Sequence, residues 1–173
     1  MLKAKGPEAT MVCQDDQTCL RIKVVIEGAV HEVQFSWDES LTTEDWGFLI
    51  VDANNAFKDI NRVGMLWTIR HLWPSISRFV FNFYLHWSSL VVRKRNGTAS
   101  FLHIKEGTTQ GGPLTMIAYG IGILPLIKNL KREIPDVAQN WYADNDRSLG
   151  ALAIIYAYFD SLTRQGPGHG YYP

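Results

Sequence analysis

Cysteine is scarce in this sequence, and the two present, Cys13 and Cys19, both lie near the N-terminus. A zinc knuckle places its cysteines two residues apart and adds a second Cys or His pair, and neither feature is present here. We therefore expect no structural metal in this segment. Two reduced thiols in a reducing compartment are the better interpretation.

Long hydrophobic segments are also absent. The longest apolar run covers residues 114 to 127, is fourteen residues long and is interrupted by two glycines and a proline. A membrane-spanning helix needs roughly 20 apolar residues, so we expect a buried helix instead. Lys3 and Lys5 are not followed by the apolar stretch and cleavage site of a secretory signal. These absences favour an intracellular protein, in the cytoplasm or nucleus, without a membrane partner.

An excess of charge of one sign is missing as well, because 17 basic and 17 acidic residues cancel. Domains that bind nucleic acids are usually basic, since contacts with phosphates supply much of their affinity. The neutral total therefore counts mildly against a nucleic-acid partner. Local basic clusters at residues 93 to 95 and 128 to 132 are candidates for such contacts, although clusters of this kind are more often solvated faces.

Several common catalytic motifs are not found either. The sequence has no Walker loop, no dinucleotide-binding glycine fingerprint and no nucleophile elbow. Its five histidines show no mutual spacing that is typical of a metal site or a catalytic triad. The sequence thus gives no support for enzymes that depend on those motifs.

What the sequence does contain is a mixture of strand and helix patterns over an ordinary globular composition, with 46% hydrophobic residues. Residues 1 to 18 are polar without a clear period and predict a loop or a frayed end. Residues 20 to 40 have a spacing closer to that of a helix. The compact apolar run at residues 46 to 52 predicts a buried strand that presents Asp52 at its end.

Two helices are expected next. Residues 61 to 73 have helical periodicity, with Asn61 as the N-cap and Pro74 as the stop. Residues 75 to 87 predict a second helix that is strongly aromatic.

A hairpin and a long helix are expected after these. The β-rich runs at residues 88 to 93 and 99 to 104 flank Asn96-Gly97, the favoured pair for a type I′ turn. Residues 113 to 132 predict one long helix that begins at a proline and ends with basic residues.

The C-terminal third returns to strand and helix patterns. Residues 137 to 143 predict a strand, residues 144 to 146 a polar turn, and residues 151 to 164 a final helix. The mixed order of elements predicts an α+β domain built on a small antiparallel sheet.

Three short segments carry the chemical argument. The first, VDANNAF at residues 51 to 57, has an acid at a strand end and an aromatic residue five positions later. The second, EGTTQGGPL at residues 106 to 114, is a glycine-rich loop that opens a helix. The third, WYADN at residues 141 to 145, is an aromatic strand that delivers an acid into a tight turn. Each is a weak signal alone, and Asp52 by itself would be an ordinary strand-end acid.

In this order and spacing, the three segments resemble motifs A, B and C of reverse transcriptases, whose forms are D-x-x-x-x-F/Y, Q-G-x-P/S and Y/F-x-D-D. The resemblance covers about residues 25 to 173 and is closest to the retroelement type. It implies an α+β fold of the right-hand polymerase palm type, with a small antiparallel sheet and helices on one face. Residues 1 to 45 would form partial fingers and residues 46 to 173 a palm-like region, with no thumb.

The resemblance implies that Asp52, Asp144 and Asn145 are the catalytic positions, and that the two aspartates bind metal. Two Mg²⁺ ions, or Mn²⁺ in their place, would activate a primer 3′-hydroxyl and hold the incoming triphosphate. Pairing of the strands before Asp52 and Asp144 would bring their carboxylates together. The implied partners are an RNA or DNA template-primer and deoxynucleotide triphosphates.

The resemblance also implies nucleotide- or template-binding roles for Ala53, Phe57, Gln110 and Gly111. Phe57 resembles the steric gate that leaves no room for a 2′-hydroxyl and so favours deoxynucleotides; the alternative is a core phenylalanine. Gln110 and Gly111 would lie beside the templating base, where glycine lets the backbone approach closely. The alternative for this loop is a plain cap of the following helix.

The sequence departs from the reverse-transcriptase pattern at motif C. Asn145 stands where the motif normally has a second aspartate, and an amide brings no charge to the metal site. Asp146 follows directly, but adjacent side chains on a strand point in different directions. Gly112 replaces an aspartate that is common in the related loop.

The length of the chain is a second departure. The residues before Asp52 are few for complete fingers, and none after Pro173 supply motif D, a primer grip or a thumb. We therefore expect weak or no polymerase activity from the 173-residue chain. The hypotheses are an RNA-directed DNA polymerase fragment and, as an alternative, a non-catalytic retroelement remnant that keeps the fold and some nucleic-acid affinity. A third, an aromatic-rich helical interaction module, leaves the three aligned motifs to coincidence.

Overall fold

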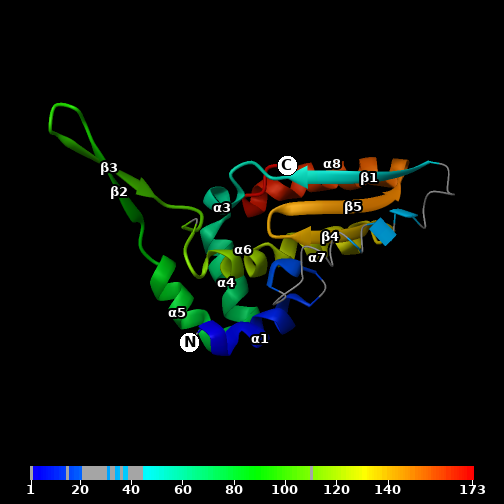
Figure 1. Ribbon diagram of the computed structural model, residues 1–173, viewed down its shortest axis with the longest axis horizontal. Helices are drawn as coiled ribbons and strands as arrows, with labels where there is room; N and C mark the ends of the chain where they lie inside the picture. The colour runs from blue at the N-terminus through cyan, green and yellow to red at the C-terminus, as the bar shows by residue number, and fades with distance from the viewer. Residues whose placement is uncertain are drawn as a thin grey trace.

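The computed structural model describes residues 2–14, 16–20, 31, 34–35, 37–38, 45–109 and 111–173. Most of the helix predicted over residues 20 to 40 lies outside these residues, as does Gln110. The fold is a mixture of helices and two small antiparallel sheets, as the α+β prediction requires (Figure 1).

The larger sheet has three strands in the order β1-β5-β4. Strand β1 (Trp46–Asp52) pairs antiparallel with β5 (Asn145–Ala151), which pairs antiparallel with β4 (Ala138–Tyr142). The sequence predicted that the strands before Asp52 and Asp144 pair with each other. This prediction was wrong, because β5 lies between them. Strand β1 was expected to be buried, but only its residue Val51 is.

The strand β5 was not predicted from the sequence. The polar turn expected over residues 144 to 146 is confined to Ala143 and Asp144, and the chain then continues as a strand. The reason is that the inward positions of β5 carry Asp146, Ser148 and Gly150 rather than large apolar residues. No alternation of hydrophobic residues marks this strand in the sequence.

The two faces of this sheet differ. Val51, Asp146 and Trp141 lie opposite one another in the register, share one face and are buried. Asp52, Asn145 and Tyr142 share the other face.

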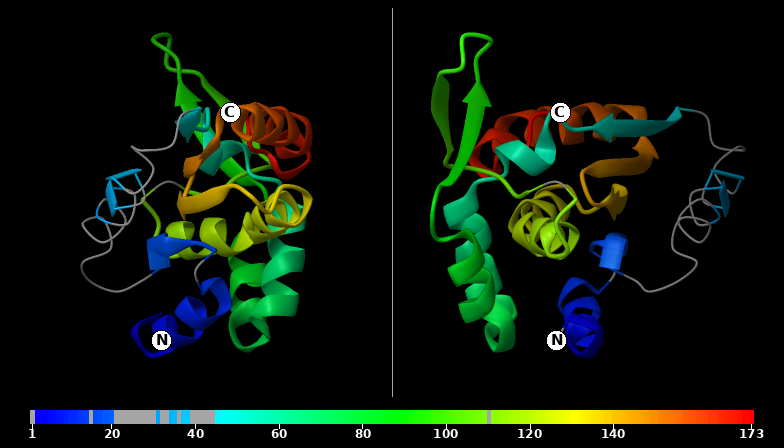
Figure 2. Two further views of the ribbon diagram at one scale, coloured as in Figure 1. Left: turned by 90° about the vertical axis from the view of Figure 1, so that its right-hand side faces the viewer. Right: turned by 60° about the vertical axis from the view of Figure 1, so that its left-hand side comes forward.

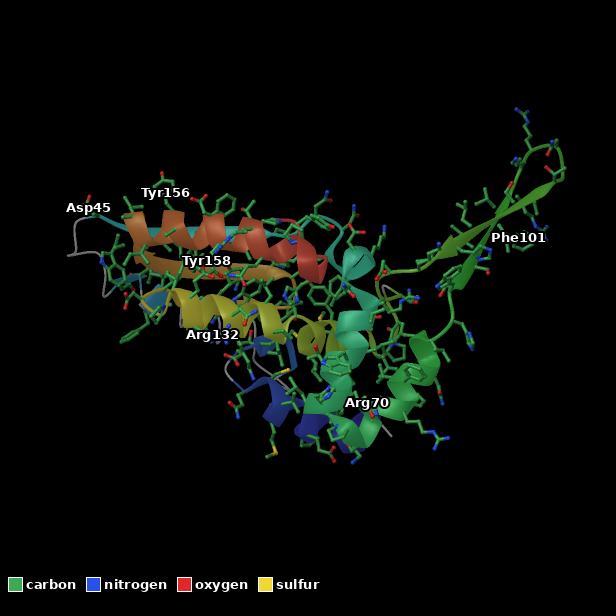
Figure 3. The ribbon with its side chains drawn as sticks, turned by 180° about the vertical axis from the view of Figure 1, so that it is seen from behind. Asp45, Arg70, Phe101, Arg132, Tyr156 and Tyr158 are labelled. Atoms are coloured by element: carbon green, nitrogen blue, oxygen red, sulfur yellow. The ribbon has the colours of Figure 1, made fainter. Side chains whose placement is uncertain are left out.

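Helices cover the Asp146 face. Figures 1 and 3, taken from opposite sides, show α7 (Leu124–Glu133) and α8 (Leu152–His169) behind the sheet in the first view and in front of it in the second. Helix α8 was expected to end near residue 164, but it continues through the Gly-Pro-Gly sequence to His169 and is capped by Gly170, which has a positive φ of 74°.

The helical half of the molecule contains α4 (Arg62–Leu72), α5 (Pro74–Tyr84) and α6 (Thr115–Gly122). Both helix signals after motif A are confirmed: Asn61 accepts a hydrogen bond from the backbone N–H of Gly64 (2.9 Å), and Pro74 begins the next helix. The single long helix predicted over residues 113 to 132 is instead two helices, α6 and α7, because Pro125 in the first turn of α7 starts a new helix.

The N-terminal segment is helical, contrary to the prediction of a loop. Helix α1 (Leu2–Cys13) includes Pro7 and places Ala9 and Cys13 in the core. A short 3₁₀ turn, η1 (Thr18–Leu20), follows it. Both cysteines are free thiols, and burial raises the pKa of each to about 12.

The smaller sheet is the hairpin of β2 (Ser88–Arg93) and β3 (Ala99–Ile104), at the boundaries that the sequence predicts. It projects from the rest of the protein in every view (Figures 1 and 2). The type I′ prediction was wrong, since only Gly97 has a positive φ (84°) and its N–H donates to the Lys94 carbonyl (3.0 Å). That is the pattern of a type I turn followed by a left-handed residue.

Among the helices of the described residues, none is long and apolar enough to cross a membrane.

Candidate functional site

Two of the predicted acids and the substituted asparagine meet at one end of the three-stranded sheet. Asp52, the last residue of β1, lies opposite Asn145, the first residue of β5. Asp144 occupies the two-residue turn directly before Asn145. The side chain of Asp52 is exposed, whereas Asp144 and Asn145 are half-buried. The Nδ2 of Asn145 donates a hydrogen bond to Oδ1 of Asp144 (3.4 Å).

The charges at this end of the sheet are unbalanced. Burial raises the pKa of Asp144 above its ordinary value, and the negative charge of Asp52 raises it further. Hydrogen bonds from the Asp144 backbone and from Asn145 offset part of this rise. Within the described ranges, no lysine or arginine forms an ion pair with either carboxylate. A cation at this position would therefore be favoured electrostatically.

Asp146 does not join this pair. Its carboxylate points to the covered face, where it accepts hydrogen bonds from Ser148 Oγ (2.8 Å) and Tyr158 OH (2.8 Å). Burial raises its pKa to about 7, although both hydrogen bonds act to lower it. Asp146 cannot replace the missing aspartate at position 145, as strand alternation predicts.

No further His, Cys, Asp or Glu side chain of the described residues joins Asp52 and Asp144 to form a larger group of metal ligands. In the part of the chain that the structure describes, no group of three or more His, Cys, Asp and Glu side chains is placed to hold a metal ion. The site thus contains two carboxylates and one amide, not the three carboxylates of the motif.

The turn that carries Asp144 is fixed by residues from both ends of the chain. The side-chain amide of Gln17 donates to the Ala143 carbonyl (3.0 Å) and accepts from the Ala143 N–H (2.7 Å). Tyr171 OH donates to the Asp144 carbonyl (3.0 Å). Ala143 has a positive φ of 53°, which is unfavourable for alanine and requires such support. Sequence reasoning missed Gln17 and Tyr171, because no local signal marks either one.

Phe57 lies in α3 (Ala56–Asp59), the short helix that follows β1. Its half-buried ring packs on Tyr119 of α6, with the ring centroids 4.6 Å apart. The hydroxyl of Tyr119 is buried and has no hydrogen-bond partner among the described residues. Burial raises the pKa of Tyr119, and the charges of Asp144 and Asp52 contribute to that rise. Phe57 and Tyr119 thus form one aromatic pair, and the charges of the two acids act on Tyr119.

The glycine-rich loop docks on α3 through its backbone. The N–H of Thr108 donates to the Phe57 carbonyl (2.6 Å), and the N–H of Gly107 donates to the Ile60 carbonyl (3.0 Å). Arg62 adds hydrogen bonds from Nε to the Gly107 carbonyl (3.0 Å) and from Nη2 to the Glu106 carbonyl (2.7 Å). The segment that follows β1 and the glycine-rich loop are thus joined as one unit.

The remaining residues with predicted nucleotide- or template-binding roles are Ala53, Gln110 and Gly111. Gly111 is exposed and has a positive φ of 84°, which glycine adopts readily. The side chain of Ala53 is buried, with 7% exposure. Gln110 lies outside the described residues, so the structure does not test its position.

Comparisons with known proteins agree with this geometry at the level of fold. No protein-family model and no curated sequence matches the chain. Among solved structures, a telomerase from Candida tropicalis truncated of its C-terminal domain superposes with a TM-score of 0.68 at 12% identity, over 98% of this chain and 38% of that one. The telomerase of Candida albicans, in complex with a fragment of telomeric RNA, gives a TM-score of 0.69 at 11% identity, over 96% and 34%.

Telomerase is a reverse transcriptase. The chain has a reverse-transcriptase-like fold. It spans about a third of the length of the telomerase chains that it matches. At these identities the likeness concerns the fold, and it neither selects a retroelement origin nor assigns a reaction.

Proposed function

We propose that this chain is the palm region of an RNA-directed DNA polymerase of the retroelement type, with Asp52 and Asp144 as its metal-binding residues. The observation that carries the proposal is the register of β1 and β5. It places Asp52 opposite Asn145 and beside Asp144 at one end of the sheet, within a reverse-transcriptase-like fold.

The residues present suit a divalent cation. Asp52 and Asp144 offer two carboxylates that form no ion pair within the described residues, and Asn145 adds an amide oxygen. All are hard ligands of the kind that Mg²⁺ prefers. Two bound ions would supply Lewis-acid activation of a primer 3′-hydroxyl and neutralise the charge of a triphosphate. Because Asn145 is neutral, the site balances one ion better than two.

The other motif residues take roles that agree with their positions. The ring of Phe57 packs on Tyr119 and is supported by the Thr108 hydrogen bond to its backbone, so a sugar would meet a fixed surface. That surface excludes a 2′-hydroxyl and selects deoxynucleotides. No described atom lies within 4 Å of a Cβ added at Gly111, so the template could approach its backbone closely.

The second candidate is a remnant that keeps the fold and holds nucleic acid without turnover. Two observations favour it: Asn145 is neutral, and the carboxylate of Asp146 is committed to the opposite face of the sheet. The hydrogen bond from Asn145 to Asp144 replaces the repulsion between two carboxylates. The site is consequently more stable without metal than the usual motif would be.

Primer extension distinguishes the candidates. A DNA primer on an RNA template, with Mg²⁺ and deoxynucleotides, would be given to the unmodified chain, to N145D and to the control D52N/N145D. We expect little or no extension by the unmodified chain, at least a tenfold gain in N145D, and none in the control. Robust extension by the control would contradict the proposed role of Asp52. Robust extension by the unmodified chain would contradict the expected impairment by Asn145. If N145D also gives no primer extension, the result would favour the remnant.

A further inference from the structure

A groove on the helical half of the molecule is separate from the acid pair. It lies between α4, α5 and the base of the β2–β3 hairpin, and its volume is about 610 Å³. Arg70, which Figure 3 labels, lies on this half, away from α8. The groove reaches the root of the glycine-rich loop, because Lys105 lines it and directly precedes that loop.

The charges of the groove are all of one sign. The described lining of the groove includes no Asp or Glu. Four cationic side chains line it: Arg62, Arg70, Arg78 and Lys105. Arg62 is committed to backbone carbonyls of the loop. Arg70, Arg78 and Lys105 form no ion pair within the described residues. The Glu106 carboxylate lies beside Arg62 and accepts a hydrogen bond from its backbone N–H (2.8 Å), so it offsets that charge. In a chain with zero net charge, the other three cations are a local excess of positive charge.

Aromatic rings accompany these cations. Trp67 is 65% exposed and Trp87 is 57% exposed, although indole rings are usually buried. One face of Trp67 packs on His71, with the centroids 4.3 Å apart, and the ammonium of Lys105 lies 4.3 Å from the centre of the Trp87 ring. Both rings lie on the same groove and remain available to a ligand.

We propose that this groove binds single-stranded nucleic acid, with the phosphates on Arg70 and Arg78 and the bases on Trp67 and Trp87. Exposed aromatic rings between cationic side chains are the combination that binds unpaired strands, because every base has a face that stacks. An acidic peptide would satisfy the cations but would leave the two indole rings exposed. The inference does not depend on polymerase activity, since the remnant described above would keep this groove.

Fluorescence anisotropy with a labelled 12-nucleotide single strand tests the proposal on the full chain. We expect R70Q/R78Q to weaken binding about tenfold at low salt and to lower the slope of log affinity against log salt by about 1.4. We expect W67A to weaken binding about tenfold and to reduce the quenching of tryptophan fluorescence. The matched controls are K128Q/R132Q, in the other basic cluster, and W46A, at an exposed tryptophan of β1.

The results that would overturn the proposal are specific. They are no binding by the unmodified chain, equal binding by R70Q/R78Q and the K128Q/R132Q control, or equal competition by an acidic 12-residue peptide and the oligonucleotide. Circular dichroism of each variant would confirm that it is folded. D52N separates this test from that of the proposed function, because it should leave binding in the groove unchanged while removing the metal site.

Discussion

The turn that joins β4 to β5 is held by side chains from both ends of the chain, whereas the turn that joins β2 to β3 is held by its own residues. Gln17 and Tyr171 bond to the first turn, and Asp146 beside it is fully buried. In the second, Asn96 accepts hydrogen bonds from the N–H and hydroxyl of Thr98. All of β2 is exposed.

The difference separates two uses of a hairpin. The β4–β5 turn positions Asp144 and Asn145 opposite Asp52, and such positioning requires a rigid backbone. The β2–β3 hairpin exposes apolar side chains such as Phe101, which Figure 3 labels, and contributes little to the core. Substitutions around the first turn should therefore reduce folding stability far more than equivalent substitutions in the second.

The largest expected effect is at Gly170. Its φ is positive, and an added Cβ would overlap the backbone carbonyl of Asp59, the last residue of α3. We expect Gly170→Ala to lower the free energy of unfolding by about 4 kcal/mol. Gly97→Ala, also at a positive φ but with no described atom within 4 Å of the added Cβ, should cost about 1 kcal/mol. Urea unfolding measures both, and equal losses would contradict the comparison.

A smaller effect is expected from pH, through Asp146. Its pKa is raised from 3.8 to about 7 in the folded protein, so the folded state keeps a proton that the unfolded state loses above pH 3.8. Stability should therefore fall as pH rises through this window and become constant above about pH 7. The expected loss is about 2 kcal/mol between pH 5 and 7.5. D146N should remove this dependence in urea unfolding; a variant that keeps it would show another group to be responsible.

Gln17→Ala is expected to reduce folding stability by as much as the pH effect of Asp146 or by less. The substitution would leave the buried N–H and carbonyl of Ala143 without their partner, at a cost of about 2 kcal/mol. Asn96→Ala removes hydrogen bonds from the exposed hairpin turn and should cost less than about 0.5 kcal/mol. Thermal unfolding of the two variants provides the check, and a larger loss in Asn96→Ala would reverse the ranking.

The parts of the fold that the sequence predicts are those with local signals. The Asn61 cap, the Pro74 stop and the two strands around Asn96-Gly97 depend on neighbouring residues, and the structure has them where expected. Strand β5 could not be predicted in this way. Its inward residues Asp146 and Ser148 hydrogen-bond to each other, and Asp146 also accepts a hydrogen bond from Tyr158, which belongs to a later helix.

The candidate site shows the same limit. Asp52 and Asp144 were selected from their motifs, and the structure brings them to one end of the sheet through β5. Gln17 could not be selected, because its partner Ala143 lies 126 positions away in the sequence. The binding roles assigned to Phe57 and Gly111 remain predictions.

Binding of Mn²⁺ tests the central claim most directly, because it requires neither a primer nor turnover. Titration monitored by electron paramagnetic resonance would compare the unmodified chain with D52N, D144N and N145D. We predict one weak site in the unmodified chain, its loss in D52N and D144N, and binding about tenfold tighter in N145D, where a third carboxylate replaces the amide. Equal Mn²⁺ affinity in the unmodified chain, D52N and D144N would contradict the assignment of these residues as a metal site.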